Sequence, residues 1–342
     1  MKNTIRRTLL YLVIVFISMM VLIPLSYLVS ISFSSAAEIN DYPKQMFPSF
    51  SHELAVTWDE ENSYYILERK NNAGKYEELY MSSKFDRIQA YLETQLNVYV
   101  EEEDLEKDFV QAKELGQKIE LTYRKSFFNN FIKFFTVFGG AEKALVNSIK
   151  AAVITIFISM SIGGLVGYAL ARTSIIGKEA ISIGSLIVRM FPMVSISVPM
   201  AILLVKYGLY DSMLGLAIVY SIPNIGLTAA ITRGIFMGVN KEFEEASMVF
   251  GATKLQTFRK ITFPLVLPAF AASSMYAFIT AWNDTAVSLL LTNKNETLAL
   301  LIYKSIGGSS SIHYAASGAI VLIIPALAFT FLLKNYITQL WG

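Results

Sequence analysis

Residues 245–264 read Glu-Ala-Ser-Met-Val-Phe-Gly-Ala-Thr-Lys-Leu-Gln-Thr-Phe-Arg-Lys-Ile-Thr-Phe-Pro and separate two long apolar runs. Acidic residues at the start of this segment favour a short helix over residues 241–250, because carboxylates stabilise the positive end of a helix. Gly251 suits the left-handed residue that ends a helix, and Thr253 can cap a second short helix that ends near Lys260. The segment therefore predicts a helix–turn–helix, and such a motif can dock into a groove on a partner protein.

The composition of the chain excludes most soluble classes of protein. Of the 342 residues, 54% are hydrophobic and only 16% are charged, whereas a soluble domain has about 45–50% apolar and about 25% charged residues. This excess is too large for one core, so it argues against a water-soluble enzyme, a disordered chain and a nucleic-acid-binding protein. The chain has no cysteine, which excludes disulfides and thiolate chemistry, and its two separate histidines suggest no metal site.

Six segments are long and apolar enough to cross a bilayer, which takes about 20 residues. We expect the first of them to be retained as a membrane helix, because its apolar stretch exceeds the roughly 7–15 residues of a signal-peptide core. In the second segment, Gly163, Gly164 and Gly167 predict close packing against another helix. The six segments are residues 9–34, 144–171, 181–205, 212–232, 265–291 and 315–333.

Charge is distributed unevenly along the chain, although its net value is only +2. Residues 35–143 contain 20 acidic and 13 basic residues, a net charge of −7, and the rest contains 7 acidic and 16 basic residues, a net charge of +9. Lys and Arg accumulate in cytoplasmic loops. With the N-terminus inside, cytoplasmic segments hold eleven basic residues and short outer loops hold three. We therefore expect both termini in the cytoplasm and the acidic segment outside.

Residues 36–143, called the insert from here on, are too long for a plain connection and predict a small α+β domain. Residues 57–83 suggest two strands that flank a turn. Residues 101–122 predict an amphipathic helix, whose four acidic residues at 101–104 we expect to be a solvated helix start rather than a binding site. Five phenylalanines within residues 127–135 suit a helix that lies on the outer membrane surface.

The spacing in the segment quoted first resembles the loop of binding-protein-dependent ABC transporter permeases. That loop has Glu-Ala-Ala, three residues, Gly, nine residues and Ile-x-Leu-Pro. The resemblance extends from about residue 144 to residue 335 and points to the smaller permease of the maltose-type carbohydrate importers, although that family usually has Glu where this chain has Asp284. The matching residues are Glu245, Ala246, Ser247 (for Ala), Gly251, Ile261, Phe263 (for Leu) and Pro264, together with residues 168–172, 190–192, 207–212 and 282–284.

This resemblance implies an all-α polytopic membrane protein with the type I ABC importer permease fold. Its six transmembrane helices would carry an extra α+β extracytoplasmic insert between helices 1 and 2. The expected parts are residues 1–35 with the N-terminal tail and first helix, the insert, and the permease core 144–342, which contains the coupling loop 233–264. The resemblance also places the chain in the cell membrane of a prokaryote.

The chain lacks the Gly-x-x-x-x-Gly-Lys-Ser/Thr loop that cradles ATP phosphates. We therefore expect no ATPase activity of its own and no cofactor bound by this chain. By resemblance, a second permease subunit completes a heterodimer, two ATPase subunits bind ATP and Mg, and an extracytoplasmic binding protein delivers the solute. The residues that would couple to the ATPases are Glu245, Ala246, Ser247, Gly251, Ile261 and Pro264, with Glu245 paired to a base on the ATPase.

Residues for the solute are candidates on chemical grounds alone, because polar groups at membrane depth are costly and usually functional. Tyr276, Trp282, Asn283 and Asp284 could line a pathway, although Trp282 could equally be packing. The resemblance further suggests that the loop with Asn293, Lys294 and Asn295 contacts the binding protein.

Three functions remain open from the sequence. The first is a permease that forms half of the translocation pathway for a carbohydrate, in particular an oligosaccharide. The second is the same transporter type for a different polar solute. The third is a membrane sensor that uses the insert, which would need an output domain beyond the last helix, where we expect none. A membrane enzyme ranks last, because no Ser/His pair or metal cluster stands out within the apolar segments.

Overall fold

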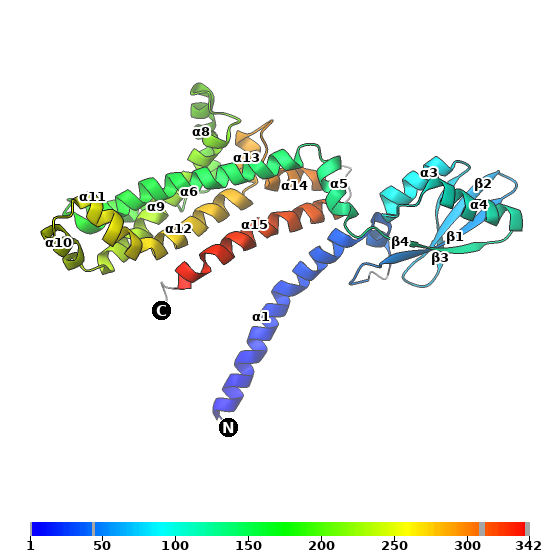
Figure 1. Cartoon of the computed structure of the whole chain (residues 1–342), viewed down its shortest axis with the longest axis horizontal. Helices are drawn as coiled ribbons and strands as arrows, with labels where there is room; N and C mark the ends of the chain where they lie inside the picture. Colours follow the sequence, from blue (N-terminus) through cyan, green and yellow to red (C-terminus); the bar gives the residue numbers. More distant parts are fainter. Residues whose placement is uncertain (1, 43–44, 308–311, 339–342) are drawn as a thin grey trace. The chain divides into compact units, whose positions relative to one another are not determined.

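The computed structural model describes residues 2–42, 45–307 and 312–338. The chain forms two compact units (Figure 1). One comprises Met1–Gly139 and Ser305–Val321, and the other comprises Gly140–Lys304 and Leu322–Gly342. The first helix and the insert lie in the first of these units.

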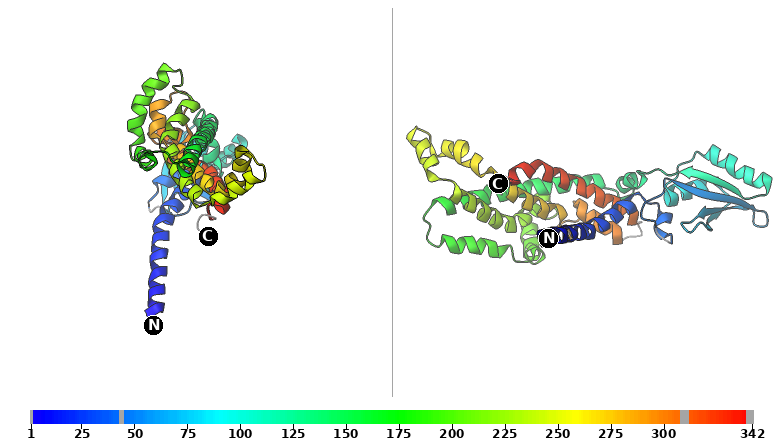
Figure 2. Two further views of the ribbon diagram at one scale, coloured as in Figure 1. Left: turned by 90° about the vertical axis from the view of Figure 1, so that its left-hand side faces the viewer. Right: turned by 90° about the horizontal axis from the view of Figure 1, so that it is seen from below.

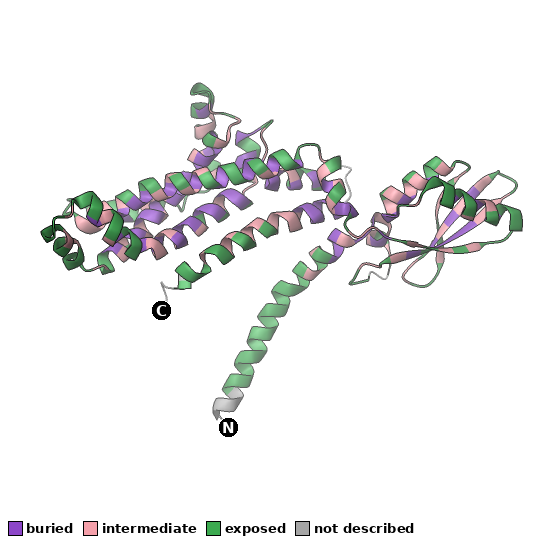
Figure 3. Ribbon diagram, viewed as in Figure 1, coloured by how far each residue is buried: buried purple, intermediate pink, exposed green. Residues whose placement is uncertain are grey.

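The second unit is entirely helical in its described residues. α6, α9 and α12 pack side by side, and their buried residues face one another (Figure 3). A shared core with Tyr220, Phe278 and Trp282 lies between them and α15. The helices are α6 (Ala141–Arg172), α7 (Lys178–Val188), α8 (Met193–Lys206), α9 (Met213–Gly238), α10 (Lys241–Val249), α11 (Lys254–Thr257), the π-helical turn η2 (Phe258–Thr262), α12 (Phe263–Asn283) and α13 (Ala286–Leu291), while α14 (Leu298–Gly307) and α15 (Ile312–Thr338) extend into both units.

Close approach of α6 to its neighbours depends on glycine, as the sequence predicts. A methyl group added to Gly163 would lie 2.7 Å from the carbonyl oxygen of Ile225 on α9. One added to Gly164 would lie 2.5 Å from the ring of Phe270 on α12. Both distances are shorter than van der Waals contact, so a larger residue at Gly163 would press against the backbone of α9, and one at Gly164 would require the Phe270 ring to move.

Five helices among the described residues are long and apolar enough to span a membrane, and there are six such spans if a bent pair of helices is counted as one. The third predicted span, residues 181–205, is this pair: α7 and α8 meet at 92° across a break of a few residues. The break falls at Pro192, which lies at the start of α8. Proline has no N–H group to donate and disfavours helical geometry in the residue before it.

The fifth predicted span, residues 265–291, is also divided. α12 ends at Asn283, and the separate helix α13 begins at Ala286. The carboxylate of Asp284 accepts hydrogen bonds from the backbone N–H groups of Val287 and Ser288. The Asp284 side chain therefore caps the start of α13, and the backbone at this residue does not continue α12.

The other unit contains α1 (Lys2–Phe33) and the insert. In the insert, a four-stranded antiparallel sheet in the order β3-β2-β1-β4 is covered on one face by helices (Figure 1). Leu54 on β1, Leu67 on β2 and Phe109 on α4 are fully enclosed between the two layers. The elements are α2 (Ala36–Asn40), β1 (Ser51–Asp59), β2 (Tyr64–Lys70), β3 (Tyr76–Ser82), α3 (Phe85–Tyr91), the π-helical turn η1 (Leu92–Leu96), α4 (Glu102–Leu115), β4 (Ile119–Arg124) and α5 (Asn129–Val137).

The α+β character of the insert is confirmed, but its strands only in part. β2 and β3 form the predicted hairpin, whereas β1 and β4 were not predicted. The helix expected over residues 101–122 stops at Leu115, because Gly116 turns left-handed with φ +58°, and the chain then enters β4. The acidic residues 101–104 are exposed around the start of α4, as expected for a solvated helix start.

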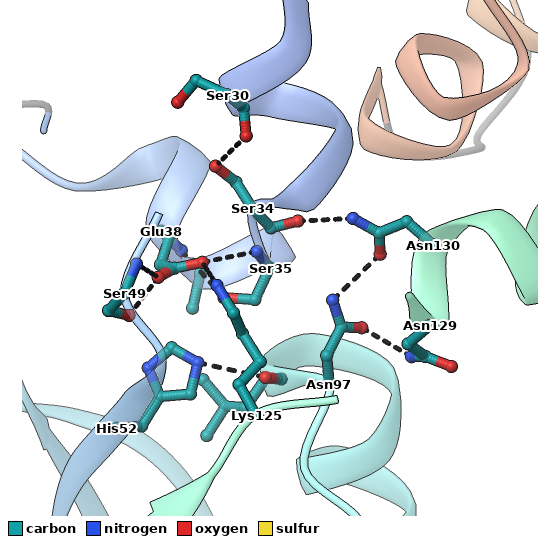
Figure 4. A network of polar contacts seen from close by, with 12 residues as sticks. Ser30, Ser34, Ser35, Glu38, Ser49, His52, Asn97, Lys125, Asn129 and Asn130 are labelled. Carbon is teal, nitrogen blue, oxygen red and sulfur yellow. Dashed lines mark hydrogen bonds and ion pairs between the residues drawn. The ribbon is translucent and has the colours of Figure 1, made fainter. Parts of the chain in front are cut away.

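A buried polar cluster joins the insert to the end of α1 (Figure 4). The ammonium of Lys125, which directly follows β4, lies 2.7 Å from the carboxylate of Glu38, and both side chains are buried. Next to them, Asn130 on α5 donates to the carbonyl oxygens of Ser32, in the last turn of α1, and of Ser34, just beyond it. These bonds satisfy buried polar groups and fix the insert directly to α1.

Two titratable groups of this cluster have shifted pKa values. Burial raises the pKa of the Glu38 carboxyl, but the charge of Lys125, the neighbouring His52 and the hydrogen bonds from Lys125 and Ser49 together outweigh burial, and the pKa falls to about 2. Burial lowers the pKa of the His52 imidazole to about 4, although Glu38 opposes this shift. The sequence suggested that His52 stands alone, but its Nε2 lies 3.0 Å from the carbonyl oxygen of Leu96.

Candidate functional site

The coupling loop begins with α10, which forms as the sequence predicts. Asn240 caps the helix by accepting a hydrogen bond from the N–H of Glu242, and Glu242 and Glu244 occupy the first turn. Gly251 ends it with φ +88°. A residue with a side chain is strained in this conformation, so glycine at this position sets the direction in which the chain leaves α10.

The second helix of the loop differs from its prediction. Thr253 and Gln256 form a capping box at the start of α11, but the helix does not end near Lys260. It continues through the π-helical turn η2 into α12, where the N–H of Phe263 donates to the carbonyl of Phe258, five residues back. Pro264 lies in the first turn of α12 and has no N–H group. The wider turn lets the helix pass this proline without a break.

Two contacts hold the loop in shape. The hydroxyls of Ser247 on α10 and Thr257 on α11 share a hydrogen bond of 2.6 Å. Arg172, at the end of α6, donates from Nε and Nη2 to the carboxylate of Glu244 at 2.9 and 2.8 Å, and from Nη2 to the carbonyl of Val239. This ion pair is largely buried, so it fixes α10 to the end of a membrane-spanning helix.

The loop exposes several large apolar side chains among its charged residues. Val249 and Phe250 are 85% and 90% exposed, and Phe243 and Leu255 are also exposed. Large apolar side chains grouped on a surface indicate a site for another protein. Glu245 and Ala246 are exposed beside them, and Glu245 forms no ion pair with any residue that the structure describes. The loop lies at one end of the helices of its unit (Figure 2).

The remaining coupling candidates are placed differently. Ser247 is partly buried by its bond to Thr257, Ile261 is partly buried in η2, and Pro264 is exposed at the start of α12. Arg172 was not among the predicted coupling residues. The sequence shows only that Arg172 is a basic residue at the end of an apolar segment. It does not reveal that the fold brings Arg172 next to Glu244 at the start of α10.

The four candidates for the solute pathway separate into two pairs. Tyr276 and Asn283 are exposed and lie seven residues apart on α12, so they share one face of the helix. Arg189 lies over the Tyr276 ring at 5.2 Å from its centroid. Asn283 lines an apolar cavity of about 290 Å³ with Phe278, Leu327 and Thr330 among its walls.

Trp282 and Asp284 make internal contacts instead. Trp282 is 1% exposed, stacks on Phe278 and donates from Nε1 to the carbonyl of Leu322 at 2.9 Å. Asp284 accepts a hydrogen bond from the hydroxyl of Tyr220 at 2.9 Å. These contacts favour the packing role that the sequence left open for Trp282.

The loop with Asn293, Lys294 and Asn295 is rigidly held. Their three consecutive N–H groups donate to the carboxylate of Asp211, at 2.8 Å from Asn293 and 3.0 Å from Asn295. Asp211 adopts a left-handed backbone with φ +56°. Burial raises the pKa of its carboxyl, but these N–H groups outweigh burial and the pKa is lowered. Asp211 was missed as a site residue, because it precedes the loop by more than 80 positions.

The same loop is also fixed to α6. The ammonium of Lys143 donates to the carbonyl of Lys294, and the amide of Asn147 donates to the carbonyl of Glu296. Arg172, which holds the coupling loop, lies at the other end of α6. The 32 residues of this helix rise about 48 Å, so the two loops lie at opposite ends of a helix as long as a bilayer is thick.

Comparisons with known proteins agree with this architecture. Residues 159–340 match the family described as "binding-protein-dependent transport system inner membrane component". The trehalose transport system permease protein of Mycobacterium tuberculosis is 32% identical over 201 residues, which are 57% of this chain and 73% of that protein. The diacetylchitobiose uptake system permease protein of Streptomyces coelicolor is 26% identical over 57% of this chain and 72% of its own length.

A solved structure shows the same fold over nearly the whole chain. It belongs to a bacterial ABC transporter involved in the import of the acidic polysaccharide alginate, with a TM-score of 0.58 and 18% identity. The alignment covers 98% of both chains, so it extends over the insert as well as the helices. From the matched family and the apolar helices together, this chain is a multi-pass membrane permease and belongs to the family of binding-protein-dependent transport system inner membrane components.

Proposed function

We propose that this chain forms half of the pathway through which an ATP-driven importer moves a carbohydrate, in particular an oligosaccharide, across the cell membrane of a prokaryote. The relatives named for trehalose and diacetylchitobiose uptake support a glycan as solute. A different polar solute is the alternative within the same transporter type.

The observation that carries the proposal is the geometry of the coupling loop. Its exposed Val249 and Phe250 fit a groove on an ATPase subunit, while Arg172 connects α10 to α6. When two ATPase subunits close on ATP and Mg, the docked α10 moves with them, and the ion pair between Arg172 and Glu244 transmits the movement to the membrane helices. Energy thus comes from partner subunits, and a second permease subunit completes the pathway as a heterodimer.

The two ends of α6 define the sides of the membrane in this proposal. The coupling loop and both termini face the cytoplasm, in agreement with the excess of Lys and Arg in these segments. Asn293, Lys294 and Asn295 face outward, where an extracytoplasmic binding protein delivers the solute. The hydrogen bonds that its N–H groups donate to Asp211 keep this loop in one conformation, which suits a docking surface because little entropy is lost on binding.

The exposed side chains of α12 are the candidates for contact with the solute. Tyr276 offers an aromatic ring and Asn283 offers an amide that can donate and accept hydrogen bonds. Trp282 and Asp284 support this face from behind through their contacts to Leu322 and Tyr220.

ATPase activity of the reconstituted complex tests the proposal. We expect a glycan from a panel of di- and oligosaccharides to stimulate ATP hydrolysis only when its binding protein is present. Absence of stimulation by every glycan, together with stimulation by an amino acid or another polar solute, would exclude the carbohydrate assignment.

Two substitutions test the coupling residues in the same complex. Glu245→Lys reverses the charge at the proposed ATPase contact, and Gly251→Pro is incompatible with the positive φ at the end of α10. We expect either to lower glycan uptake at least about tenfold without loss of the protein from the membrane. Glu102→Lys, on an equally exposed first helical turn of the insert, is the matched control, and uptake unchanged by both loop variants would contradict the assignment.

A further inference from the structure

The insert carries a hollow of about 580 Å³ on its surface, within the range of about 300–1,000 Å³ typical of small-molecule sites. Aromatic rings and polar side chains line it together. Its lining includes Trp58, Tyr65, Ser83, Phe85, Lys113 and Glu114. They come from β1, β2, the start of α3 and the last turn of α4, so the sheet and both covering helices build this site.

The aromatic wall of the hollow is rigid. Trp58 and Tyr65 are directly opposite each other in the β1–β2 register, and their rings meet edge to face at 4.6 Å. Tyr65 also contacts Phe85 at 5.5 Å and is only 4% exposed. Trp58 remains partly exposed above this support. A large ring held in place by the core presents its face to a ligand with little loss of conformational freedom on binding.

The polar rim consists of neighbouring groups of opposite charge. Lys113 places its ammonium 4.1 Å from the centre of the Trp58 ring, so the electron-rich face already attracts a positive group, and a ligand that stacks on this face would displace the exposed Lys113 ammonium to the rim. Glu114 follows on the same turn. Within the described ranges of the chain neither residue forms an ion pair, and both are exposed. Together they offer donors and an acceptor without a net charge.

We propose that this hollow binds one pyranose ring of a glycan, a conclusion that rests on the proposed carbohydrate function and adds a second sugar site outside the membrane helices. A pyranose has one face of C–H groups that packs on an aromatic ring and a rim of hydroxyls that both donate and accept hydrogen bonds. The C–H face fits Trp58, and the hydroxyls fit Lys113, Glu114 and Ser83.

Other ligand classes fit the hollow less well. An anionic polymer would meet the carboxylate of Glu114 and the net charge of −7 of the surrounding segment. A purely apolar ligand would leave Lys113 and Glu114 desolvated without partners, which costs free energy. A neutral polyhydroxyl ligand satisfies both the rings and the charged pair.

Saturation-transfer NMR on the full chain in lipid nanodiscs tests the site. The probes are trehalose, maltotetraose and diacetylchitobiose, each without binding protein or ATPase subunits. We expect transfer to the ring C–H protons of at least one probe, and an affinity about tenfold lower in Trp58→Ala. Phe47→Ala removes another exposed aromatic ring of the insert, 73% exposed and outside the hollow, and is expected to leave the affinity unchanged.

A second variant protects the test against loss of folding. Glu114→Ala changes only an exposed side chain, and we expect a smaller loss of affinity of about three- to fivefold. Saturation transfer that is unchanged in both Trp58→Ala and Glu114→Ala, or absent with all three probes, would overturn the site. In the latter case glycan-stimulated ATPase activity of the complex would still establish the proposed function. Binding at the hollow with no glycan-stimulated ATPase activity would instead support the sugar site and contradict the proposed function as a carbohydrate importer.

Discussion

Lys125 and Glu38 form an ion pair inside the insert, where each charge alone would be strongly destabilising. Their side chains are 0% and 9% exposed, and backbone N–H groups of Ser35 and Ser49 complete the coordination of the carboxylate. Removing one partner of a buried pair typically costs about 3–5 kcal/mol, because the other charge is left uncompensated. The pair therefore stabilises the insert only as long as both charges are present, because either charge alone would be buried without a partner.

The shifted pKa values of this cluster predict a loss of stability in acid. His52 titrates near 4 in the folded insert against 6.5 when unfolded, so protonation favours unfolding as the pH falls below 6.5. Glu38 titrates near 2 against 4.5, so its contribution is present above pH 4.5 and is lost as the pH falls towards 2. We expect the free energy of unfolding of the insert to fall in these two ranges, on the order of a few kcal/mol in total.

Fluorine NMR of the full chain labelled with 5-fluorotryptophan measures this effect. The Trp58 resonance, assigned with Trp58→Phe, reports denaturant unfolding of the insert at a series of pH values. His52→Gln removes the titratable group and should abolish the loss between pH 6.5 and 4 while retaining the loss below 4.5. A midpoint of unfolding independent of pH from 7 to 3 would refute the assignment.

At the level of elements, the sequence predicts those whose determinants are local. The apolar runs locate α1, α6, α9 and α15, and Asn240 to Gly251 locate α10 to within a residue at either end. The strand β1 escapes prediction because it pairs with β4, more than 60 residues away, and its burial depends on that partner. The break between α7 and α8 and the end of α4 follow from single residues, Pro192 and Gly116, whose effect competes with an otherwise helical pattern.

The candidate site shows the same division. The loop's own helices are predictable from caps and a glycine, whereas its connection to α6 is a contact between residues 72 positions apart. Trp282 is buried through its contact with Leu322, and Asp211 binds the 293–295 loop through hydrogen bonds. Both are contacts between distant parts of the chain, which a local sequence pattern does not reveal.

The connection between α6 and α10 gives a prediction at this scale. Arg172→Ala removes three charge-assisted hydrogen bonds, each worth about 1.5–3 kcal/mol when buried. We expect hydrogen exchange of the α10 amides to accelerate at least about tenfold and uptake per ATP hydrolysed to fall, because α10 then moves without α6. Arg233→Ala, which breaks a more exposed pair with Glu179, is the matched control. Equal protection of α10 in Arg172→Ala and the native chain would show that the ion pair does not couple these helices.

At the scale of the whole molecule, the proposed function requires the coupling loop and the insert to lie on opposite sides of the membrane. The positive charge of the loops predicts this arrangement, and the absence of cysteine makes it directly measurable, because any introduced cysteine is the only thiol of the chain. Phe250→Cys marks the coupling loop at a position that is 90% exposed. Glu60→Cys marks an exposed turn of the insert.

We expect a membrane-impermeant maleimide to label Glu60→Cys in right-side-out vesicles and Phe250→Cys only in inside-out vesicles. Detergent-solubilised samples should label both, which controls for the reactivity of each thiol, and the native chain should label in neither preparation. Phe250→Cys in the complex with ATPase subunits should be protected even in inside-out vesicles, because the apolar surface of the loop is then covered. Labelling of both positions from the same side would overturn the orientation, and with it the proposal that the loop meets ATPases in the cytoplasm while the insert meets glycans outside.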